Sequence, residues 1–508
     1  MQTLRKTVFW PSFGLLSLAI IYSIANPEGF LDQMKLLNAA LLSNCGPLFS
    51  LTSFLMLLLL IALFVSPLGR IRIGGPKAEP ILNRWKWFSI TICTTIATGI
   101  LFWGTAEPLY HYGSPPASAG LAAESPEAAQ FALSTLYLHW SFTPYAIYSL
   151  PALVFALAHY NYGAKYSLTA LLFPFLKTKK EGGFHSFKGL SSIIDSLCLF
   201  ALVAGMASSL GAGLLTLAGG LESQLGWTAN SNMLLLICII TVLAFIISAA
   251  TGLKKGIQFL SSINIWAFIF IALSFLFLGP GQKMLPLIGS SLGEYFGTFL
   301  EKNLYNIYHP KEKWANSWTT FYWANWMAWA PITALFLGKI ARGYTLREML
   351  LFNWILPSIF ALIWMSIFGG SALWAVQTGE DLLGSLSANG AESIIYELMA
   401  KYAAPLMPFM ALLFIFTVFL SYVTAADSNT EAMGSISMDG LATGDSPKLY
   451  IKVIWGLCIG AAAYIMVSQA GIKGIKMLSN LGGLPALLLL LTASLGLLYW
   501  MFKKRFGF

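Results

Sequence analysis

The stretch GPLFSLTSFLMLLLLIALFVSP, residues 46–67, decides the fold, because it contains no charged side chain from end to end. A helix rises about 1.5 Å per residue, so about 20 apolar residues cross a hydrocarbon core about 30 Å thick. Similar blocks recur along the chain, whose 508 residues are 57% hydrophobic and only 10% charged. Soluble domains carry about 25% charged residues. The composition therefore excludes a water-soluble fold and predicts an all-α membrane protein.

The apolar blocks predict about twelve transmembrane helices. They lie at approximately 8–26, 46–67, 87–106, 130–159, 190–221, 231–251, 256–279, 316–340, 348–376, 404–428, 448–469 and 477–502. The first block ends at Asn26-Pro27 without the cleavage site of a secretory signal. We therefore expect it to be the first span.

Positive charge gathers in every second connection between these blocks. The basic residues are Arg5 and Lys6; Arg70, Arg72, Lys77, Arg84 and Lys86; Lys165, Lys177, Lys179, Lys180 and Lys188; Lys254 and Lys255; Lys339, Arg342 and Arg347; Lys448 and Lys452; and Lys503, Lys504 and Arg505. The intervening loops at 113–129 and 222–230 contain neither Lys nor Arg. The positive-inside rule then predicts a multi-pass inner (cytoplasmic) membrane protein with both termini in the cytoplasm. The net charge of +9 reflects this topology and predicts lipid, not nucleic acid, as the surroundings.

The connection at 281–315 departs from this alternation, because it is predicted to be external and yet carries four lysines. Glu294, Glu301 and Glu312 partly offset them. The segment is amphipathic in places, so we expect it to lie along the outer surface.

Four predicted spans contain Gly, Pro or hydroxyl residues near their centres. These interruptions are 94–99, Thr143-Pro144, Ala330-Pro331 and 424–427. Freed backbone at this depth is tolerated only against protein or a water-filled cavity, and in transporters it marks the binding site. Helix packing explains any single interruption equally well, but the four together favour a transport path.

Two predicted spans are unusually aromatic, with HWSFTPYAIY at 139–148 and FYWANWMAWAP at 321–331. Trp323, Trp326 and Trp329 recur every three residues and form a tilted stripe on a helix. Neither segment contains Asp or Glu. A primary ammonium needs hydrogen-bond acceptors, whereas a trimethylammonium has no donor and can be held by ring faces. The pattern therefore favours an onium compound, and above all a zwitterion, which brings its own carboxylate.

Few carboxylates lie near the predicted spans. Glu107, Asp195 and Asp427 all fall near predicted interfaces, so a cap or loop pair is favoured over a proton relay for each. The five histidines lack metal-ligand spacing such as HExxH. We expect His139, next to Trp140, to be a packed or hydrogen-bonded core histidine.

Five stretches together resemble the betaine/choline/carnitine transporter (BCCT) family. They are WGTAEPLYHY at 103–112, HWSFTPYAIY at 139–148, GMASSLGAGLLTLAGGL at 205–221, FYWANWMAWAPITALFLGKIARGYTLREM at 321–349 and, more weakly, VTAADS at 423–428. Their order and spacing match the family over nearly the whole chain.

The resemblance implies two inverted five-helix repeats, spans 3–7 and 8–12, preceded by two extra helices. The corresponding regions are 1–86 with two N-terminal helices and a basic loop, 87–280 with the first repeat, 281–315 as external connection, 316–502 with the second repeat, and 503–508 as cytoplasmic tail. It also implies a homotrimer.

The substrate site implied by the resemblance lies between the fourth and eighth spans. We call Trp140, Tyr145, Tyr148, Trp326 and Trp329 the aromatic box. Trp323 matches an additional aromatic residue on the path towards the cytoplasm. Thr95, Ala97 and Gly99 stand where the family has a glycine ladder, and Ile96, Ala97 and Gly99 are candidate substrate-binding residues. Asn325, also a candidate, and Tyr145 replace residues that are often Trp. These departures leave open a substrate other than glycine betaine.

The resemblance also bears on the coupling ion. One sodium site is expected through Thr424 and backbone carbonyls near Cys93, Ile96 and Ser421, and no other cofactor is implied. Exchangers of the family carry an Arg where this chain has Asn264. Cation-coupled uptake is therefore favoured over exchange. An amino-acid-like solute is an alternative, whereas an enzyme or a channel lacks a catalytic constellation or a filter motif.

Overall fold

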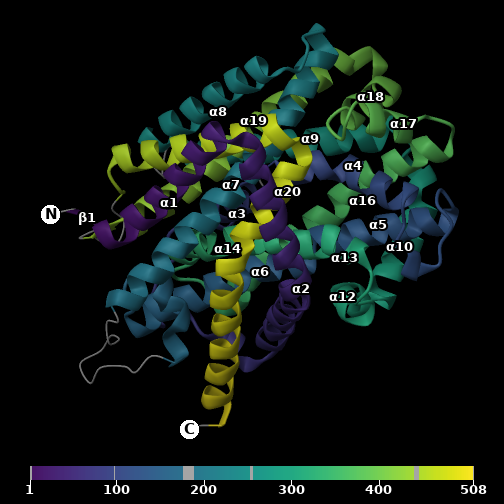
Figure 1. Cartoon of the computed structure of the whole chain (residues 1–508). Helices are drawn as coiled ribbons and strands as arrows, with labels where there is room; N and C mark the ends of the chain where they lie inside the picture. Colours follow the sequence, from purple (N-terminus) through teal and green to yellow (C-terminus); the bar gives the residue numbers. More distant parts are fainter. Residues whose placement is uncertain (1–2, 97, 176–187, 252–255, 440–445, 507–508) are drawn as a thin grey trace.

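The computed structural model describes residues 3–96, 98–175, 188–251, 256–439 and 446–506, and the chain is helical almost throughout these ranges (Figure 1). The side chains at 96, 174, 188, 251, 256–258 and 505–506 are outside the description. Some predicted residues therefore lie outside the described part: Ala97, Lys177, Lys179, Lys180, Lys254 and Lys255, together with the side chains of Ile96, Lys188 and Arg505.

Long α-helices make up most of the fold. They are α1 (Lys6–Ala25), α2 (Pro27–Val65), α3 (Arg84–Ile96), α4 (Gly99–Gly113), α5 (Pro126–Trp140), α6 (Phe142–Ala156), α7 (Lys188–Leu225), α8 (Ser231–Thr251), α9 (Gly256–Leu278), α14 (Thr319–Ile340), α16 (Leu356–Gln377), α19 (Met407–Ile436) and α20 (Leu449–Phe506).

Shorter elements connect them. The short α-helices are α10 (Leu285–Gly297), α11 (Phe299–Asn303), α12 (Tyr305–Tyr308), α13 (Lys313–Ser317), α15 (Leu346–Leu350), α17 (Leu382–Ala388) and α18 (Ile394–Tyr402). The 3₁₀ turns are η1 (Pro67–Arg70), η2 (Ala117–Ala119), η4 (Leu168–Phe175), η5 (Gly281–Met284) and η7 (Ala404–Leu406), and the π-helical turns are η3 (Leu157–Asn161) and η6 (Leu351–Ile355). Strands β1 (Thr3–Leu4) and β2 (Met438–Asp439) pair antiparallel near the N-terminus.

Within the described residues, nine helices are long and apolar enough to cross a membrane, or up to ten if the bent pair α3–α4 is one span. The prediction of an all-α membrane protein is confirmed. α14 is not among the nine, because its Trp, Tyr and Asn residues lower its mean hydropathy. α20 joins two helices at Gly471, whose φ of 51° favours glycine. The number twelve, the inverted repeats and the region boundaries stay predictions.

Two of the four predicted interruptions are real. The third predicted span is divided into α3 and α4, which meet at an angle of 56°. The fourth is divided into α5 and α6 at Ser141, whose φ of −115° and ψ of −119° are not helical. Both breaks lie beside the predicted aromatic segments.

The other two predicted interruptions are wrong. α14 continues through Pro331, and α19 continues through 424–427 as far as Ile436. In α19 the hydroxyl residues bond to carbonyls of their own helix, such as Thr424 to Leu420 at 3.0 Å and Thr430 to Ala426 at 2.7 Å. Side chains that satisfy the helix from within do not break it. Asp427 is consequently in mid-helix and not at the end of a span, and it accepts a hydrogen bond from Ser248 at 2.5 Å.

The N-terminal helices differ from their predicted spans at one boundary. α2 begins at Pro27, well before the predicted start at 46. Pro27 occupies the first helical position, and the side chain of Asn26 accepts a hydrogen bond from the Gly29 N–H at 3.0 Å. Both are signals for a helix start. Hydropathy finds the apolar part of a helix, whereas capping chemistry decides where it begins.

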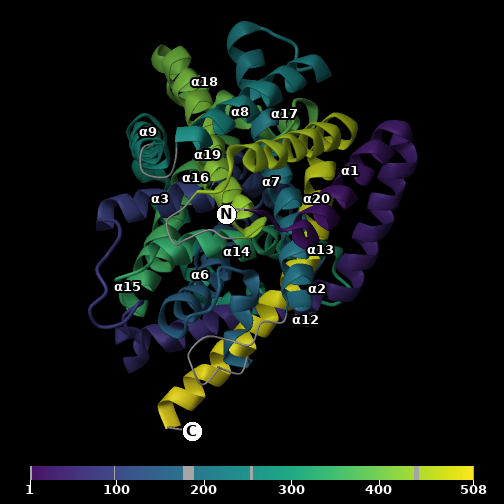
Figure 2. The same ribbon diagram turned by 90° about the vertical axis from the view of Figure 1, so that its left-hand side faces the viewer.

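α14 lies at the centre of the molecule, between α6, α7 and α20 (Figures 1 and 2). Glycines allow this close approach. A Cβ on Gly338 of α14 would lie 2.6 Å from the Phe155 ring of α6, and one on Gly483 of α20 would lie 2.5 Å from the Ala324 carbonyl oxygen. Small residues at such contacts let membrane helices pack tightly. The aromatic segment of α14 is therefore buried inside the protein.

The connection at 281–315 packs onto α5 through the short helices α10 and α11. Lys302 is 5% exposed, pairs with Glu294 at 2.7 Å and lies 4.2 Å from the Phe131 ring centroid. Burial lowers the pKa of Lys302 to about 8, although the Glu294 carboxylate acts in the opposite direction. One of the four lysines in this segment is thus an internal anchor, which reduces its apparent departure from the charge rule.

Asp195 at the start of α7 has the predicted loop-pair role. Its carboxylate is buried, pairs with Arg5 at 2.9 Å and accepts the Leu168 N–H at 2.9 Å. The pair fastens the chain's N-terminal segment to η4 and α7.

Candidate functional site

A cavity lies where α4, α6, α7, α14 and α20 meet. Its walls are mainly aromatic, with a polar strip on one side. The lining residues are Thr95, Gly99, Trp103, Trp140, Tyr148, Ser208, Ser209, Ala212, Phe321, Asn325, Trp326, Trp329 and Ile475. None of these residues carries a charge. The cavity is thus neutral and ring-lined, as the sequence predicted for an onium site.

Most of the predicted substrate residues meet at this cavity. Gly99, Trp140, Tyr148, Asn325, Trp326 and Trp329 line it. Tyr145 lies behind the lining, with its ring centroid 5.5 Å from that of Trp326. Trp323 is fully buried away from the cavity, 6.1 Å from the His139 ring. Ala97 and the side chain of Ile96 lie outside the described residues.

Trp326 is the centre of the aromatic box. Its ring centroid lies 5.6 Å from Trp140, 5.5 Å from Tyr145 and 4.9 Å from Tyr148. The planes are inclined at 73°, 57° and 59°, so the rings form walls at different angles and do not stack. Trp140, Tyr148 and Trp326 also line the cavity, and aromatic rings that line a cavity can hold a cation by cation–π attraction.

Glycines make room for two of these rings. A Cβ on Gly99, at the start of α4, would lie 2.7 Å from the Trp140 ring, and one on Gly205 of α7 would lie 2.8 Å from the Trp329 ring. Any side chain at either position would displace an indole. Gly99 therefore contributes space beside the ring, in addition to lining the cavity.

Behind the box lies Glu107 of α4, whose side chain is fully buried inside the protein. The sequence favoured a structural role for it as a cap or loop pair, and the structure shows a hydrogen-bonded network between helices. Trp140 Nε1 donates to Oε2 at 2.9 Å, and the Tyr322 hydroxyl donates to the same oxygen. Residues from α4, α5 and α14 converge on this carboxylate, and no property of the α4 sequence alone indicates that.

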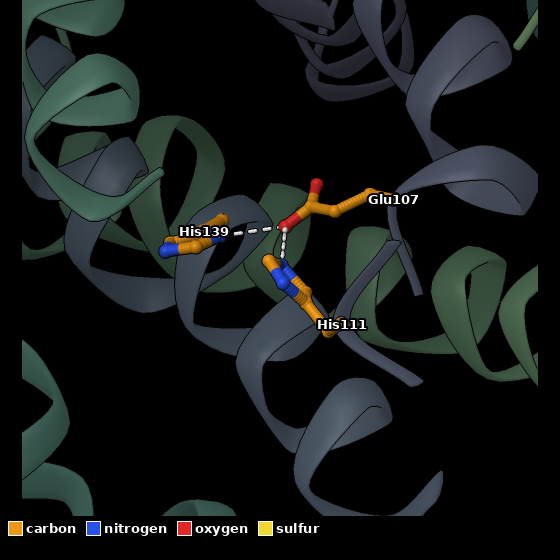
Figure 3. A group of neighbouring side chains, drawn as sticks. All are labelled: Glu107, His111 and His139. Atoms are coloured by element: carbon orange, nitrogen blue, oxygen red, sulfur yellow. Dashed lines mark hydrogen bonds and ion pairs between the residues drawn. The ribbon is translucent and has the colours of Figure 1, made fainter. Parts of the chain in front are cut away.

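Two histidines complete the shell of Glu107. Figure 3 shows Oε1 of the carboxylate bonded to both imidazole rings, at 2.6 Å from His139 Nδ1 and 3.3 Å from His111 Nε2. A carboxylate only accepts, so each imidazole donates its N–H. His139 also contacts the Thr319 hydroxyl through Nε2 at 3.1 Å. His139 is therefore the hydrogen-bonded core histidine that was predicted.

Glu107, His111 and His139 are also the group whose ligand atoms lie closest to one another, all within 4.8 Å. Two ligands of one metal ion, each about 2.1 Å from it, are more than about 3 Å apart. The 2.6 Å contact between Glu107 and His139 is shorter than this. The present arrangement is thus a hydrogen-bonded triad, and a metal ion would require the two side chains to separate.

A polar strip faces the aromatic walls. Ser479 of α20 bonds to Ser208 at 2.5 Å and to the Asn325 side-chain oxygen at 2.8 Å. Thr98 donates to the Ser209 carbonyl at 2.7 Å. Sequence reasoning missed Trp103, Ser208, Ser209 and Phe321, although all four lie inside the motifs that carried the family resemblance. Ile475 carried no signal.

Two of the residues expected to hold sodium, Cys93 and Ser421, are linked through Asn264. Asn264 of α9 donates to the Ser421 hydroxyl at 2.9 Å, and its Nδ2 lies 3.7 Å from Cys93 Sγ. Thr424 contacts the Ser421 carbonyl at 3.1 Å. Cys93 is in the last turn of α3, where carbonyls lack partners within the helix. A helix end rich in such carbonyls is a suitable place for a cation.

A helical bundle with broken spans around a buried, ring-lined cavity defines a membrane transport protein. The family model described as BCCT, betaine/carnitine/choline family transporter, matches residues 7–505. The chain belongs to this family of membrane transporters, and it is a multi-pass membrane protein.

Relatives with named substrates are similar over most of this chain. The chain is 30% identical to the glycine betaine transporter OpuD of Bacillus subtilis, covering 96% of this chain and 93% of the relative. It is 29% identical to an ectoine/hydroxyectoine transporter of Virgibacillus pantothenticus, covering 97% and 96%. It is 30% identical to the osmo-dependent choline transporter BetT2 of Acinetobacter baylyi, covering 86% and 62%.

Proposed function

We propose that the protein is a secondary active transporter that imports a quaternary-ammonium or related onium compound, such as a betaine, carnitine or choline, through the aromatic box. The observation that carries the proposal is the ring of inclined aromatic side chains around Trp326. Trimethylammonium groups cannot donate hydrogen bonds, and a desolvated ring contributes up to about 2 kcal/mol to holding them. Betaine, ectoine and choline in the names of the relatives support the same class of substrate.

Glu107 adds to this site from behind the rings. Its carboxylate accepts the Trp140 indole N–H at 2.9 Å. A negative charge at the N–H edge increases the electron density of the ring and attracts a cation at its face. The onium group thus gains electrostatic stabilisation from Glu107 without direct contact, because the aromatic ring lies between its methyl groups and the carboxylate.

Coupling to a cation is the second part of the proposal. Sodium would be held by Thr424, by the backbone carbonyls near Cys93 and Ile96 at the end of α3, and by the carbonyl near Ser421 in α19. Asn264 supports a neutral site, because it stands where the family's exchangers carry an Arg. The alternative is exchange of one onium compound for another. Uptake is measured in proteoliposomes under a sodium gradient, under a proton gradient, or with a counter-substrate alone. The three conditions distinguish sodium coupling, proton coupling and exchange.

We place the protein in the inner membrane as a homotrimer with cytoplasmic termini, as the charge alternation and the family resemblance indicate. An amino-acid-like solute is the alternative substrate, motivated by Asn325 and Tyr145. Competition binding distinguishes the two, since a primary amine that displaces betaine would favour the amino-acid-like solute.

The test of the box is Trp326→Ala in proteoliposomes loaded for glycine betaine or choline uptake. Loss of one central ring is expected to reduce uptake at low substrate more than about tenfold. Trp227→Ala is the matched control, because that ring is 56% exposed in the connection between α7 and α8. Uptake that survives in a folded Trp326→Ala protein would contradict the proposal.

A further inference from the structure

A lysine of the chain itself occupies a second group of rings beside the cavity. Nζ of Lys476 in α20 lies 3.5 Å from the Trp318 ring centroid, 4.9 Å from Phe321 and 5.2 Å from Trp103. We call Trp103, Trp318 and Phe321 the lysine cage. Ammonium groups within about 6 Å of a ring face are attracted to it. The cage therefore surrounds the amino group of Lys476.

This charge adjoins the end of the substrate cavity. Two members of the cage, Trp103 and Phe321, also line the cavity. Ile475, the residue before the lysine, is in the lining as well. One turn further along α20, Ser479 bonds to the lining residues Ser208 and Asn325. The lysine is thus positioned by a helix face that forms part of the cavity wall.

The ammonium retains hydrogen-bonding capacity. Among the described residues, Nζ donates to one acceptor, the Ser317 carbonyl, at 3.2 Å. A lysine ammonium has three donors on a flexible stem. The neighbouring rings attract the charge but accept hydrogen bonds poorly, so a carboxylate would be a better partner for the remaining donors.

The Glu107 network lies next to the lysine cage, because the His111 ring centroid is 4.6 Å from that of Trp318. Glu107 bonds to Trp140 of the aromatic box at 2.9 Å, and the lining between Glu107 and Lys476 is uncharged. Glu107 therefore lies behind Trp140, and Lys476 lies beside the neighbouring rings of the lysine cage. A zwitterion can present its carboxylate to the Lys476 ammonium, whereas a cation without a carboxylate is only repelled by it.

We propose that Lys476 recognises the carboxylate of the substrate and selects onium zwitterions, of the betaine, carnitine or ectoine type, over onium cations without a carboxylate. This inference rests on the aromatic box as the onium site. It makes Lys476 the specificity-determining residue of the transporter. The rings of the lysine cage hold the ammonium in place until a carboxylate arrives.

The experiment measures the affinity of the purified full-length protein for glycine betaine, its methyl ester and choline. The ester retains the trimethylammonium group and lacks the negative charge. The wild type is expected to bind glycine betaine at least tenfold more tightly than either the ester or choline. This comparison uses the wild-type protein alone, so its result does not depend on whether a variant folds.

The variants then assign the preference to the lysine. In Lys476→Met the preference is expected to fall at least tenfold, through weaker betaine binding with choline affinity unchanged or increased. Lys476→Arg should keep most of it. Lys473→Met is the matched control, because Lys473 is exposed on the same helix.

Two results overturn the inference alone. One is a wild type that binds the ester or choline as tightly as betaine; the other is a folded Lys476→Met protein with unchanged selectivity. In both, affinity would still depend on Trp326. If Trp326→Ala leaves all three affinities unchanged, the aromatic box itself fails, and the role of Lys476 fails with it.

Discussion

The aromatic box and the lysine cage are built from the same kinds of side chain and yet have different occupants. Trp318 in the cage lies 3.5 Å from an ammonium of the chain, whereas no Lys or Arg of the described residues lies over the box rings. The box instead has a carboxylate behind it, at 2.9 Å from Trp140. Rings that enclose a tethered cation are already satisfied. Rings backed by a negative charge, with space between them, can accept a cation from outside.

The largest expected effect comes from removing the charge behind the box, with Glu107→Gln. An amide has one accepting oxygen for four converging donors, and its NH₂ would face other donors. Opposite charges several Å apart inside a protein attract by about 2 kcal/mol or more, so onium affinity should fall about 30-fold. Breaking a buried, charged network also costs about 3 kcal/mol of folding stability.

Ligand binding and thermal unfolding of Glu107→Gln, compared with the exposed Glu28→Gln, check both effects. Unchanged onium affinity in a folded Glu107→Gln protein would show that the carboxylate serves structure alone. The contrast between the box and the lysine cage would then lose its electrostatic basis.

A tenfold effect is expected from Gly99→Ala. The added Cβ would lie 2.7 Å from the Trp140 ring, so the indole must move and the box changes shape. The rings of the lysine cage are not among the atoms that this Cβ would meet. Uptake at low substrate should fall about tenfold, since one ring contributes about 1 to 2 kcal/mol.

Gly293→Ala in α10 is the control for this change, because a Cβ there meets nothing within 4 Å. Equal activity of the two variants would mean that the position of Trp140 is not critical.

The smallest effect is expected from Trp318→Leu, which removes the ring closest to Lys476 and is not part of the cavity lining. Loss of one partly exposed cation–π contact weakens the hold on the ammonium by about 0.5 to 1 kcal/mol. The affinity for glycine betaine should change about two- to fivefold, with little effect on choline. Isothermal titration with both ligands measures it, and an equal change for both would assign Trp318 to general packing.

Hydropathy and charge alternation predicted the class of fold well, because each segment that crosses lipid must by itself be apolar and satisfy its backbone hydrogen bonds. Sequence reasoning also predicted that 139–148 and 321–331 lie together, and Trp140, Tyr148, Asn325, Trp326 and Trp329 of these segments line one cavity. That an onium compound binds there stays a prediction. It failed at Pro331 and at 424–427, where the helices continue. In α19, hydroxyl groups bond to the carbonyl one turn earlier, so a composition typical of a break is accommodated within an unbroken helix.

The sequence by itself determined that this chain is a helical membrane protein and which segments supply the aromatic residues of the cavity. The tertiary structure decided that Glu107 is buried under Trp140 and that Lys476 reaches Trp318 across the molecule. Apolar length and ring content are properties of one segment. The partners of a buried charge come from helices far apart in the chain, and only packing brings them within hydrogen-bond or ring-contact distance.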